Sequence, residues 1–157
     1  MSGVVVQLGF CQFKGHQLIP VDAVQSSTHT CGGCSGGPAK FCIDSNHSTI
    51  CHTLHHVDNA PWVALSFKVP ITVTAVEIVN SQWDRVGNVE VRVTNTLPTD
   101  GSTMFSGGHL FGSYIAGNKR LEATPRQGMF VLVQRHPGQF PNDILIMEEI
   151  QIFGFKG

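Results

Sequence analysis

Phe41-Cys-Ile-Asp-Ser-Asn-His-Ser-Thr-Ile-Cys-His-Thr53 is a polar run that crowds oxygen ligands, imidazoles and thiols into one short stretch. Soon afterwards comes Ala60-Pro-Trp-Val-Ala-Leu-Ser-Phe67, in which larger apolar residues occupy every second position from Val63. Successive side chains of a β-strand point to opposite faces, so this alternation is typical of a half-buried strand. The two segments together predict a structured ligand loop held by a β-sheet.

The same period of two recurs along the rest of the chain. Val89, Val91 and Val93 alternate with polar or charged neighbours, and long runs with helical spacing are nearly absent. The 17 glycines and 8 prolines interrupt the sequence often, as in the turn-like segments 99–102 and 136–139. Further strands are expected at about 4–13, 72–80, 110–115, 129–133 and 144–153. The pattern predicts an all-β sandwich or jelly roll.

Length and charge exclude several classes of function. A chain of 157 residues matches one domain, expected to span residues 1–157. Only 13% of residues are charged, the net charge is −1 and no Lys/Arg cluster occurs, which argues against nucleic acid or a polybasic membrane patch as partner. The start of the chain lacks the basic region of a signal peptide. We therefore expect either an intracellular protein or a domain of a larger extracellular or cell-surface protein.

The cysteines lie in the first third of the chain, and there are five: Cys11, Cys31, Cys34, Cys42 and Cys51. An odd number leaves at least one thiol unpaired or in an intermolecular bond. Cys42 and Cys51 bracket the polar run and could clip it into a loop, whereas Cys31 and Cys34 could close a tight turn.

The polar run offers hard oxygen ligands at alternate positions. Asp44, Asn46 and either Ser48 or Thr49 have the spacing that a compact loop needs to surround Ca²⁺. The segment is not an EF-hand loop, because its sixth position is Thr49 rather than Gly and its twelfth is His55 rather than Glu. An equal alternative is a loop whose side chains cap their own backbone in Asx-turns.

Two adjacent carboxylates interrupt the apolar run at 144–155. Neighbouring residues of a strand face opposite sides, so either Glu148 or Glu149 is expected to point inward. An inward carboxylate needs a partner, and a cation held by the Asp44 loop would supply one. A salt bridge or an exposed edge strand would explain the pair equally simply.

The order of these motifs resembles the discoidin, or coagulation factor 5/8 type C, family, and most closely its fucose-binding F-type lectins. The resemblance runs from about Pro20 to Gly154. It rests on five segments in the family's order: Ala23-Val-Gln-Ser-Ser27, Cys42-Ile-Asp-Ser-Asn46, Cys51-His-Thr53 with Ala60-Pro-Trp62, Arg85-Val-Gly-Asn-Val-Glu-Val-Arg92, and Glu149-Ile-Gln-Ile-Phe-Gly154. It implies an eight-stranded jelly roll (galactose-binding domain-like) with loops clustered at one end.

The resemblance also implies a structural Ca²⁺ ion, which shapes a loop and takes no part in chemistry. Its ligands would be side chains and main-chain oxygens of the polar run and the final strand. The side-chain ligands would come from Asp44, Thr49 and Glu149, and the main-chain oxygens from Phe41, Asn46 and Glu148.

The sugar site of F-type lectins joins one histidine to two later basic residues. His52 and Arg85 match the first and last positions, but Ser81 or Gln82 stands where the family has its first arginine. The family's adjacent cysteine pair is also absent. The residues that could meet a sugar are His52, His55, His56, Trp83, Asp84 and Arg85. Alternatively, Trp83 fills the edge of the sandwich, and Arg85 pairs at the surface with Asp84 or Asp58.

The leading hypothesis is a non-enzymatic, calcium-stabilised lectin-like module whose partner is a glycan or glycoprotein, perhaps a fucosylated one. A second hypothesis is a protein-interaction module that uses the same loops within a larger assembly. A third is attachment to phospholipid through apolar loop residues. The candidates for that role are Trp83, Met104-Phe105 and Leu110-Phe111.

Two features fall outside these hypotheses. His47, His52, His55 and His56 cluster near the cysteines and raise a zinc hypothesis, ranked below disulfide or reduced-thiol arrangements because the spacing is poor. The amino-terminal extension, residues 1–19, lies outside the resemblance. Its segment 4–13 alternates like an added strand that would pair at a sheet edge or with a second copy.

Overall fold

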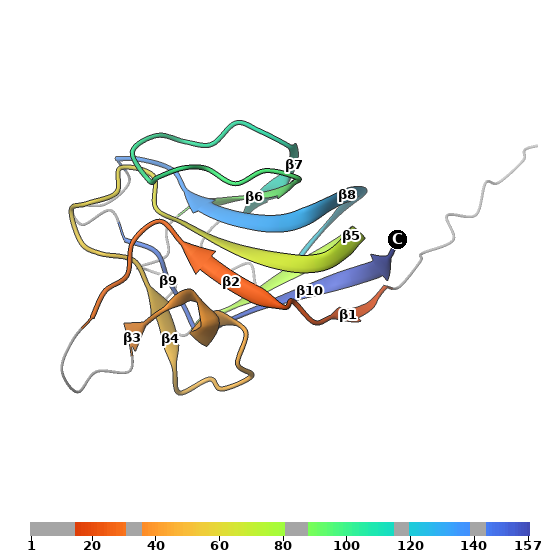
Figure 1. Ribbon diagram of the computed structural model, residues 1–157, viewed down its shortest axis with the longest axis horizontal. Coiled ribbons are helices and arrows are strands. Elements are labelled where there is room, and N and C mark those ends of the chain that lie inside the picture. Colours follow the sequence, from red (N-terminus) through yellow and green to blue (C-terminus); the bar gives the residue numbers. More distant parts are fainter. Residues whose placement is uncertain (1–14, 31–35, 81–87, 115–119, 139–143) are drawn as a thin grey trace, which may run out of the picture.

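The computed structural model describes residues 15–30, 36–80, 88–114, 120–138 and 144–157 (Figure 1). Within these ranges the only helical element is the short 3-10 helix η1 (Ala39–Cys42), and no helix is long and apolar enough to cross a membrane. The strands are β1 (His16–Leu18), β2 (Asp22–Gln25), β3 (Gly36–Gly37), β4 (Ile50–His52), β5 (Trp62–Val79), β6 (Val89–Thr94), β7 (His109–Tyr114), β8 (Arg120–Arg135), β9 (Ile146–Met147) and β10 (Glu149–Lys156). The all-β prediction is confirmed.

The strands form a large sheet and a small one. The large sheet has the order β1-β10-β5-β8-β6-β7, with β2 also paired to β5, and the small sheet has the order β3-β4-β9. Within the large sheet every pairing is antiparallel. The two-residue strands β3 and β9 bring the described strands to ten, compared with the eight expected. The strands predicted within 62–80, 89–94, 110–115, 129–133 and 144–153 all lie in or overlap described strands.

The long strand β5 changes partner along its length. Its first part, residues 63–66, pairs with β2, and its later part, residues 71–79, pairs with β10. The β5–β8 register shifts between Ser66 and Ile71, a stretch that contains Pro70. Proline has no N–H for the ladder and is found at such irregularities. The first half of β5 begins at the loop-rich end of the sandwich (Figure 1).

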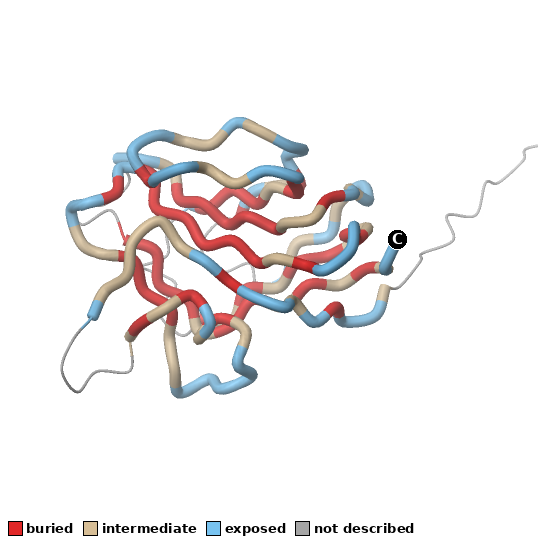
Figure 2. Tube along the Cα trace, viewed as in Figure 1, coloured by how far each residue is buried: buried red, intermediate tan, exposed pale blue. Residues whose placement is uncertain are grey.

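The alternation of apolar residues along β5 places Val63, Leu65 and Phe67 in the core, as the sequence predicts. Val63, Leu65 and Phe67 join the main core with buried residues of β6, β8 and β10, while Trp62 and Ala64 pack on the opposite face of β5 against Leu132. Figure 2 shows this buried stripe along β5 and β8. Val69 continues the same alternation in the sequence, but it is 42% exposed. It lies in the interruption of the β5–β8 pairing, where the alternation is not maintained.

The extension meets the sheet edge at β1. His16 pairs with Gly154, and Leu18 pairs with Ile152, so β1 adds a strand beside β10. The strand expected at 4–13 lies outside the described residues. The described part of the extension therefore covers the edge that β10 would otherwise expose.

Candidate functional site

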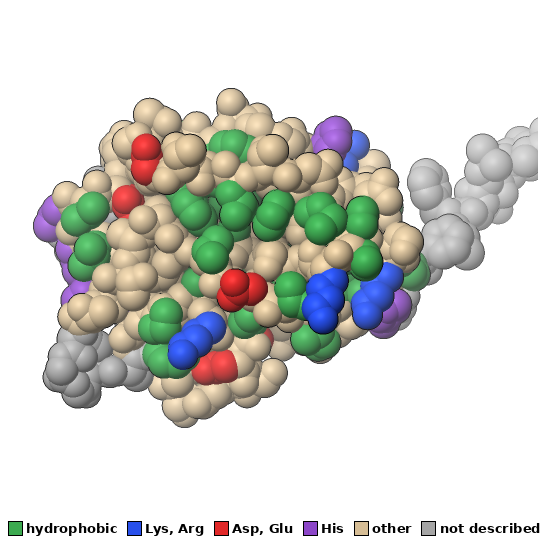
Figure 3. All heavy atoms as spheres, viewed as in Figure 1, with side chains coloured by type: hydrophobic (Ala, Val, Ile, Leu, Met, Phe, Trp, Pro, Cys, Tyr) green, Lys and Arg blue, Asp and Glu red, His purple; other side chains and the backbone are tan. Residues whose placement is uncertain are grey.

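Three segments that are distant in sequence meet at the loop-rich end of the sandwich. The His29 N–H donates to the His52 carbonyl at 2.8 Å, which joins the segment after β2 to β4. The Ala60 N–H donates to the Gly101 carbonyl at 2.8 Å, which joins the segment before β5 to the β6–β7 connection. Histidine side chains gather at this end, on the left of the view in Figure 3.

His29, His52 and His55 form a cluster at this end. The ring centroid of His52 lies 4.5 Å from that of His29 and 5.3 Å from that of His55. One ring nitrogen from each residue lies within 4.8 Å of the other two. His52 is 6% exposed, whereas the other two are half-buried. His29 and His55 are therefore more accessible to a ligand than His52 is.

Hydrogen bonds to one carboxylate hold the loops behind this cluster. Asp58 is 6% exposed, and its Oδ2 accepts hydrogen bonds from the hydroxyls of Ser26, at 2.6 Å, and Ser27. The Ser27 hydroxyl in turn accepts from the Leu54 N–H at 3.0 Å. Asp58 is thus a buried bridge between two loops. Arg85 lies outside the described residues, so its pairing with Asp58 stays a prediction.

The polar run is closed by a disulfide. Cys42 and Cys51 are bonded, with Cα atoms 5.4 Å apart, and both are fully buried. The prediction that this pair clips the run into a loop is confirmed. Cys51 consequently has no thiol that could act as a nucleophile or as a thiolate metal ligand. Cys11, Cys31 and Cys34 lie outside the described residues.

Oxygen atoms converge inside the disulfide-closed loop. The Thr49 hydroxyl lies 2.8 Å from Asp44 Oδ2 and 2.8 Å from the Asn46 carbonyl oxygen. The Asn46 N–H donates to Asp44 Oδ1 at 2.9 Å, which is an Asx-turn. The turn expected by the alternative interpretation is therefore present, and it places the same oxygens on one side of the loop.

Glu149 connects this loop to the final strand. It begins β10, is 4% exposed, and accepts a hydrogen bond from the Ser45 N–H at 3.2 Å. Burial raises the pKa of Glu149 to about 7, the Ser45 hydrogen bond opposes this shift, and the nearby Asp44 carboxylate reinforces it. Its neighbour Glu148 is only half-buried. The prediction that one member of the pair points inward is confirmed.

The other predicted site residues have different placements. Trp83, Asp84 and Arg85 lie outside the described residues, so their roles stay predictions. Phe41 is half-buried within η1, and His56 is exposed with a φ of 58°. His29 was missed by sequence reasoning, because it lies in a run of small polar residues and no spacing motif links it to His52.

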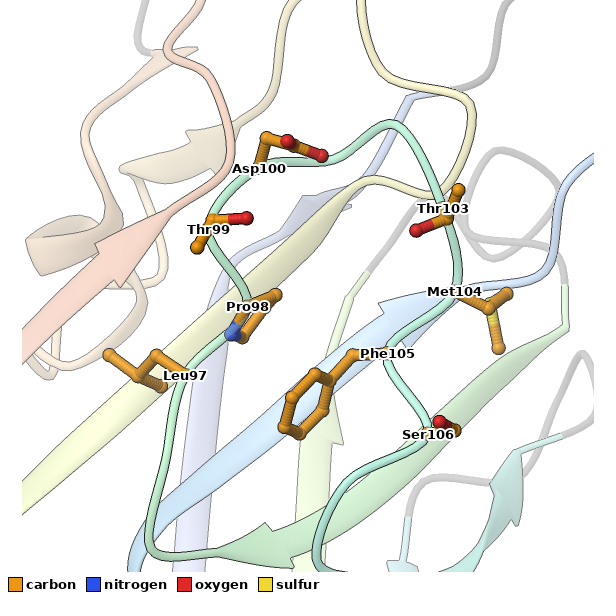
Figure 4. A pocket seen from close by; sticks show the side chains of 8 residues that line it. All are labelled: Leu97, Pro98, Thr99, Asp100, Thr103, Met104, Phe105 and Ser106. Atoms are coloured by element: carbon orange, nitrogen blue, oxygen red, sulfur yellow. The ribbon is translucent and has the colours of Figure 1, made fainter.

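A depression lies in the β6–β7 connection, near the loop end (Figure 4). It has a volume of about 280 Å³ and is lined by Leu97, Pro98, Thr99, Asp100, Thr103, Met104, Phe105 and Ser106. Phe105 packs against the Trp62 cluster, and Phe111 is 4% exposed within the main core. The expectation of an apolar loop residue at the membrane is therefore wrong for Phe111, which is buried, whereas Phe105 is half-buried and Leu110 is 49% exposed.

Comparison with known proteins identifies the fold. No protein-family model and no curated protein sequence matches the chain. A fucolectin from striped bass (Morone saxatilis) serum aligns with a TM-score of 0.68 and 22% identity, over 86% of this chain and 47% of that lectin. The fold is the discoidin, or galactose-binding-like, jelly roll. This chain thus spans about half the length of the striped bass lectin.

Two further galactose-binding-like structures match over nearly their whole length. One is chitosan-binding module 1 of a chitosanase/glucanase from Paenibacillus sp. IK-5, with a TM-score of 0.65, 18% identity, and coverage of 88% of this chain and 99% of the module. The other is a fucose-binding module from Streptococcus pneumoniae, with a TM-score of 0.60, 18% identity, and coverage of 89% and 96%. These matches confirm the architecture that the sequence resemblance implied.

Proposed function

We propose that this chain is a non-catalytic carbohydrate-binding module that binds a glycan at the loop end of the sandwich. The site would contain His52, His55 and Arg85, with Trp83 and Asp84 beside them. One observation carries the proposal. The chain has the fold of known sugar-binding lectins and modules, and its loop-rich end brings His52 and His55 together. Fucosylated glycans are the first class to test.

The chemistry of the cluster suits a neutral sugar. Glycan hydroxyls are recognised by donors and acceptors held at fixed positions, beside an apolar or aromatic surface. His29 and His55 are half-buried, and the ring of the buried His52 lies beside both of them. The Asp58 hydrogen bonds restrain the loops that carry these rings, which lowers the entropy lost on binding.

We also propose a structural Ca²⁺ ion in the disulfide-closed loop. Ca²⁺ takes six to eight oxygen ligands, and Asp44, Thr49 and Asn46 already bring their oxygens together. The buried carboxylate of Glu149 has a raised pKa, as expected for a charge that benefits from a cationic partner. Main-chain oxygens of Phe41, Asn46 and Glu148 would complete the set. When bound, the ion would fix the loop without taking part in chemistry.

The disulfide supports a location outside the cell or at its surface. Disulfides persist in oxidising compartments and are rare in the cytosol. Cys42–Cys51 is buried in the core, so it is part of the folded structure. We propose that the chain works as a module of a larger extracellular or cell-surface protein.

A glycan array tests the proposal. The purified chain is probed in Ca²⁺ and after chelation, beside His55→Ala and Arg85→Ala variants, with His109→Ala as a matched control because His109 is an exposed histidine on β7. We expect calcium-dependent glycan binding that both site variants weaken at least about tenfold and the control retains. Absence of glycan binding by the folded, calcium-loaded chain would contradict the proposal. A stable protein complex without glycan binding would instead favour the protein-interaction module.

A further inference from the structure

We propose that His29, His52 and His55 form a binding site for a divalent transition-metal ion of the Zn²⁺ class. The site is separate from the disulfide-closed loop that carries Asp44, and it does not depend on the glycan proposal. Three imidazoles converge there from two loops, and one nitrogen from each lies within 4.8 Å of the others. The ring of His52 lies closest to both partners, with centroid distances of 4.5 Å and 5.3 Å.

The distances suit zinc after a small contraction. Zinc binds imidazole nitrogen at ~2.0–2.1 Å in tetrahedral geometry, so bound nitrogens lie roughly 3.3–3.4 Å apart. The present limit of 4.8 Å exceeds this separation by about 1.5 Å. His29 and His55 are half-buried beside the buried His52, so the contraction that we propose requires side-chain movement at the surface rather than in the core.

One ring nitrogen of His52 is held by a hydrogen bond to the backbone. Its Nδ1 lies 2.5 Å from the Thr53 carbonyl oxygen, which can only accept a hydrogen bond. The Nδ1 atom must therefore carry the proton, and in the neutral ring the lone pair is on Nε2. Metal-bound histidines commonly donate their other N–H to a carbonyl or carboxylate in this way. Thr53 is itself held by Leu145, through a 3.1 Å backbone bond and a 2.9 Å bond to its hydroxyl.

The backbone around the cluster is also restrained. The His52 carbonyl accepts hydrogen bonds from the His29 N–H at 2.8 Å and from Gln25 Nε2 at 3.1 Å. The bridge from Ser27 to Asp58 and Leu54 holds the loop that leads to His55. Little loop entropy would then be lost when a metal binds, because these segments are ordered by protein contacts.

The three imidazole ligands also distinguish this site from the cysteine pair and from the proposed calcium loop. The zinc hypothesis from sequence drew on cysteines, but Cys42 and Cys51 form a disulfide and offer no thiolate. Imidazole suits zinc and its neighbours in the first transition series, whereas Ca²⁺ takes oxygen ligands. Three protein ligands leave a fourth tetrahedral position for water or an external donor, so the ion would remain reachable from solution.

Metal titration of the tag-free chain tests this inference. The protein is stripped with chelator, returned to excess Ca²⁺, and titrated with Zn²⁺ by calorimetry and with Co²⁺ by visible absorption. We expect one Zn²⁺ per chain and a tetrahedral-type Co²⁺ spectrum. His29→Ala and His55→Ala should each weaken Zn²⁺ binding at least about tenfold, the scale seen when even supporting groups of a zinc site are lost.

Three controls make the result specific. His56→Asn alters the exposed neighbour of His55, and His47→Ala alters a histidine of the disulfide-closed loop. The Cys31→Ser/Cys34→Ser double variant removes two other potential ligands. All three should bind Zn²⁺ like the parent chain, and thermal unfolding should show that each variant is folded. The inference is overturned if the folded parent chain does not bind Zn²⁺, if both histidine variants bind it unchanged, or if binding depends on the cysteines. None of these readouts involves a glycan.

Discussion

The Ser45 backbone N–H donates a hydrogen bond of 3.2 Å to Glu149 Oε2, across a sequence separation of 104 residues. This bond fastens the tip of the disulfide-closed loop to the first residue of β10. Glu149 is 4% exposed, and its Oε2 atom faces the loop that carries Asp44. The state of one buried carboxyl group therefore affects the stability of the whole loop.

The stability of the calcium-free protein should fall as the pH rises from about 4.5 to about 7. The pKa of Glu149 is raised from its ordinary value of 4.5 to about 7, so the folded state holds this proton more tightly than the unfolded state. The contribution is present in full below pH 4.5 and is lost as pH rises through 7. A shift of this size corresponds to about 3 kcal/mol, at roughly 1.4 kcal/mol per pKa unit. Urea unfolding in chelator across this pH range measures it.

The control for this prediction is the neighbouring residue. Glu149→Gln should flatten the pH dependence, whereas Glu148→Gln should leave it in place because Glu148 is half-buried and does not accept the Ser45 bond. Saturating Ca²⁺ should restore stability at pH 7, by about 3 kcal/mol when the ion is at 100 times its Kd. An identical pH profile for Glu149→Gln and the parent chain would contradict the role assigned to Glu149.

Removal of the Cys42–Cys51 disulfide should lower the free energy of unfolding by about 2–3 kcal/mol, the entropy of closing a loop of this size. The Cys42→Ala/Cys51→Ala variant should also bind Ca²⁺ more weakly, because Asp44 and Thr49 would no longer be held close together. Urea unfolding and calcium titration measure the two effects. Cys11→Ser, with the bond intact, serves as control. A double variant with unchanged calcium affinity would show that the loop is ordered without the disulfide.

Asp58→Ala should destabilise the loop end by about 1–3 kcal/mol, because it leaves the hydroxyls of Ser26 and Ser27 without their acceptor in a partly buried place. The loops carrying His29 and His55 would then separate more easily, so glycan and Zn²⁺ binding should weaken together. Amide hydrogen exchange of residues 26–29 and 53–58 measures the loosening. Asp22→Ala is a suitable control, because Asp22 is an exposed aspartate on β2. Equal exchange rates in Asp58→Ala and the parent chain would contradict the bridging role.

Gly154→Ala should cost about 3 kcal/mol or more. A Cβ at this position would lie 1.9 Å from the Thr72 carbonyl oxygen, in the backbone of the adjacent strand β5. Gly112→Ala is the matched control, since its nearest contact is the flexible end of the Leu121 side chain at 2.8 Å, and it should stay within about 1 kcal/mol of the parent. Thermal unfolding compares the two. Similar melting temperatures for both variants would show that β10 moves away from β5 freely.

The fold could be predicted from sequence because its signals are local. Alternation in Val63, Leu65 and Phe67 and in the 89–93 valines depends only on the period of a strand, and these residues do lie in the core. Val69 departs from this rule because the bulge near Pro70 depends on how β5 pairs with β8. Local spacing does not encode such a shift in pairing.

By itself the sequence determined the all-β architecture, and it indicated that Cys42 and Cys51 could close the polar run and that one glutamate points inward. Each of these inferences follows from residues close together in the chain. Only the tertiary structure decided that His29 stands beside His52, that Asp58 bridges two loops, and that Phe111 packs into the core. These relationships arise when β2, β4 and β5 bring distant loops to one end of the sandwich. The partner of a side chain at this end depends on strand pairing across the whole chain, and a short stretch of sequence does not predict that pairing.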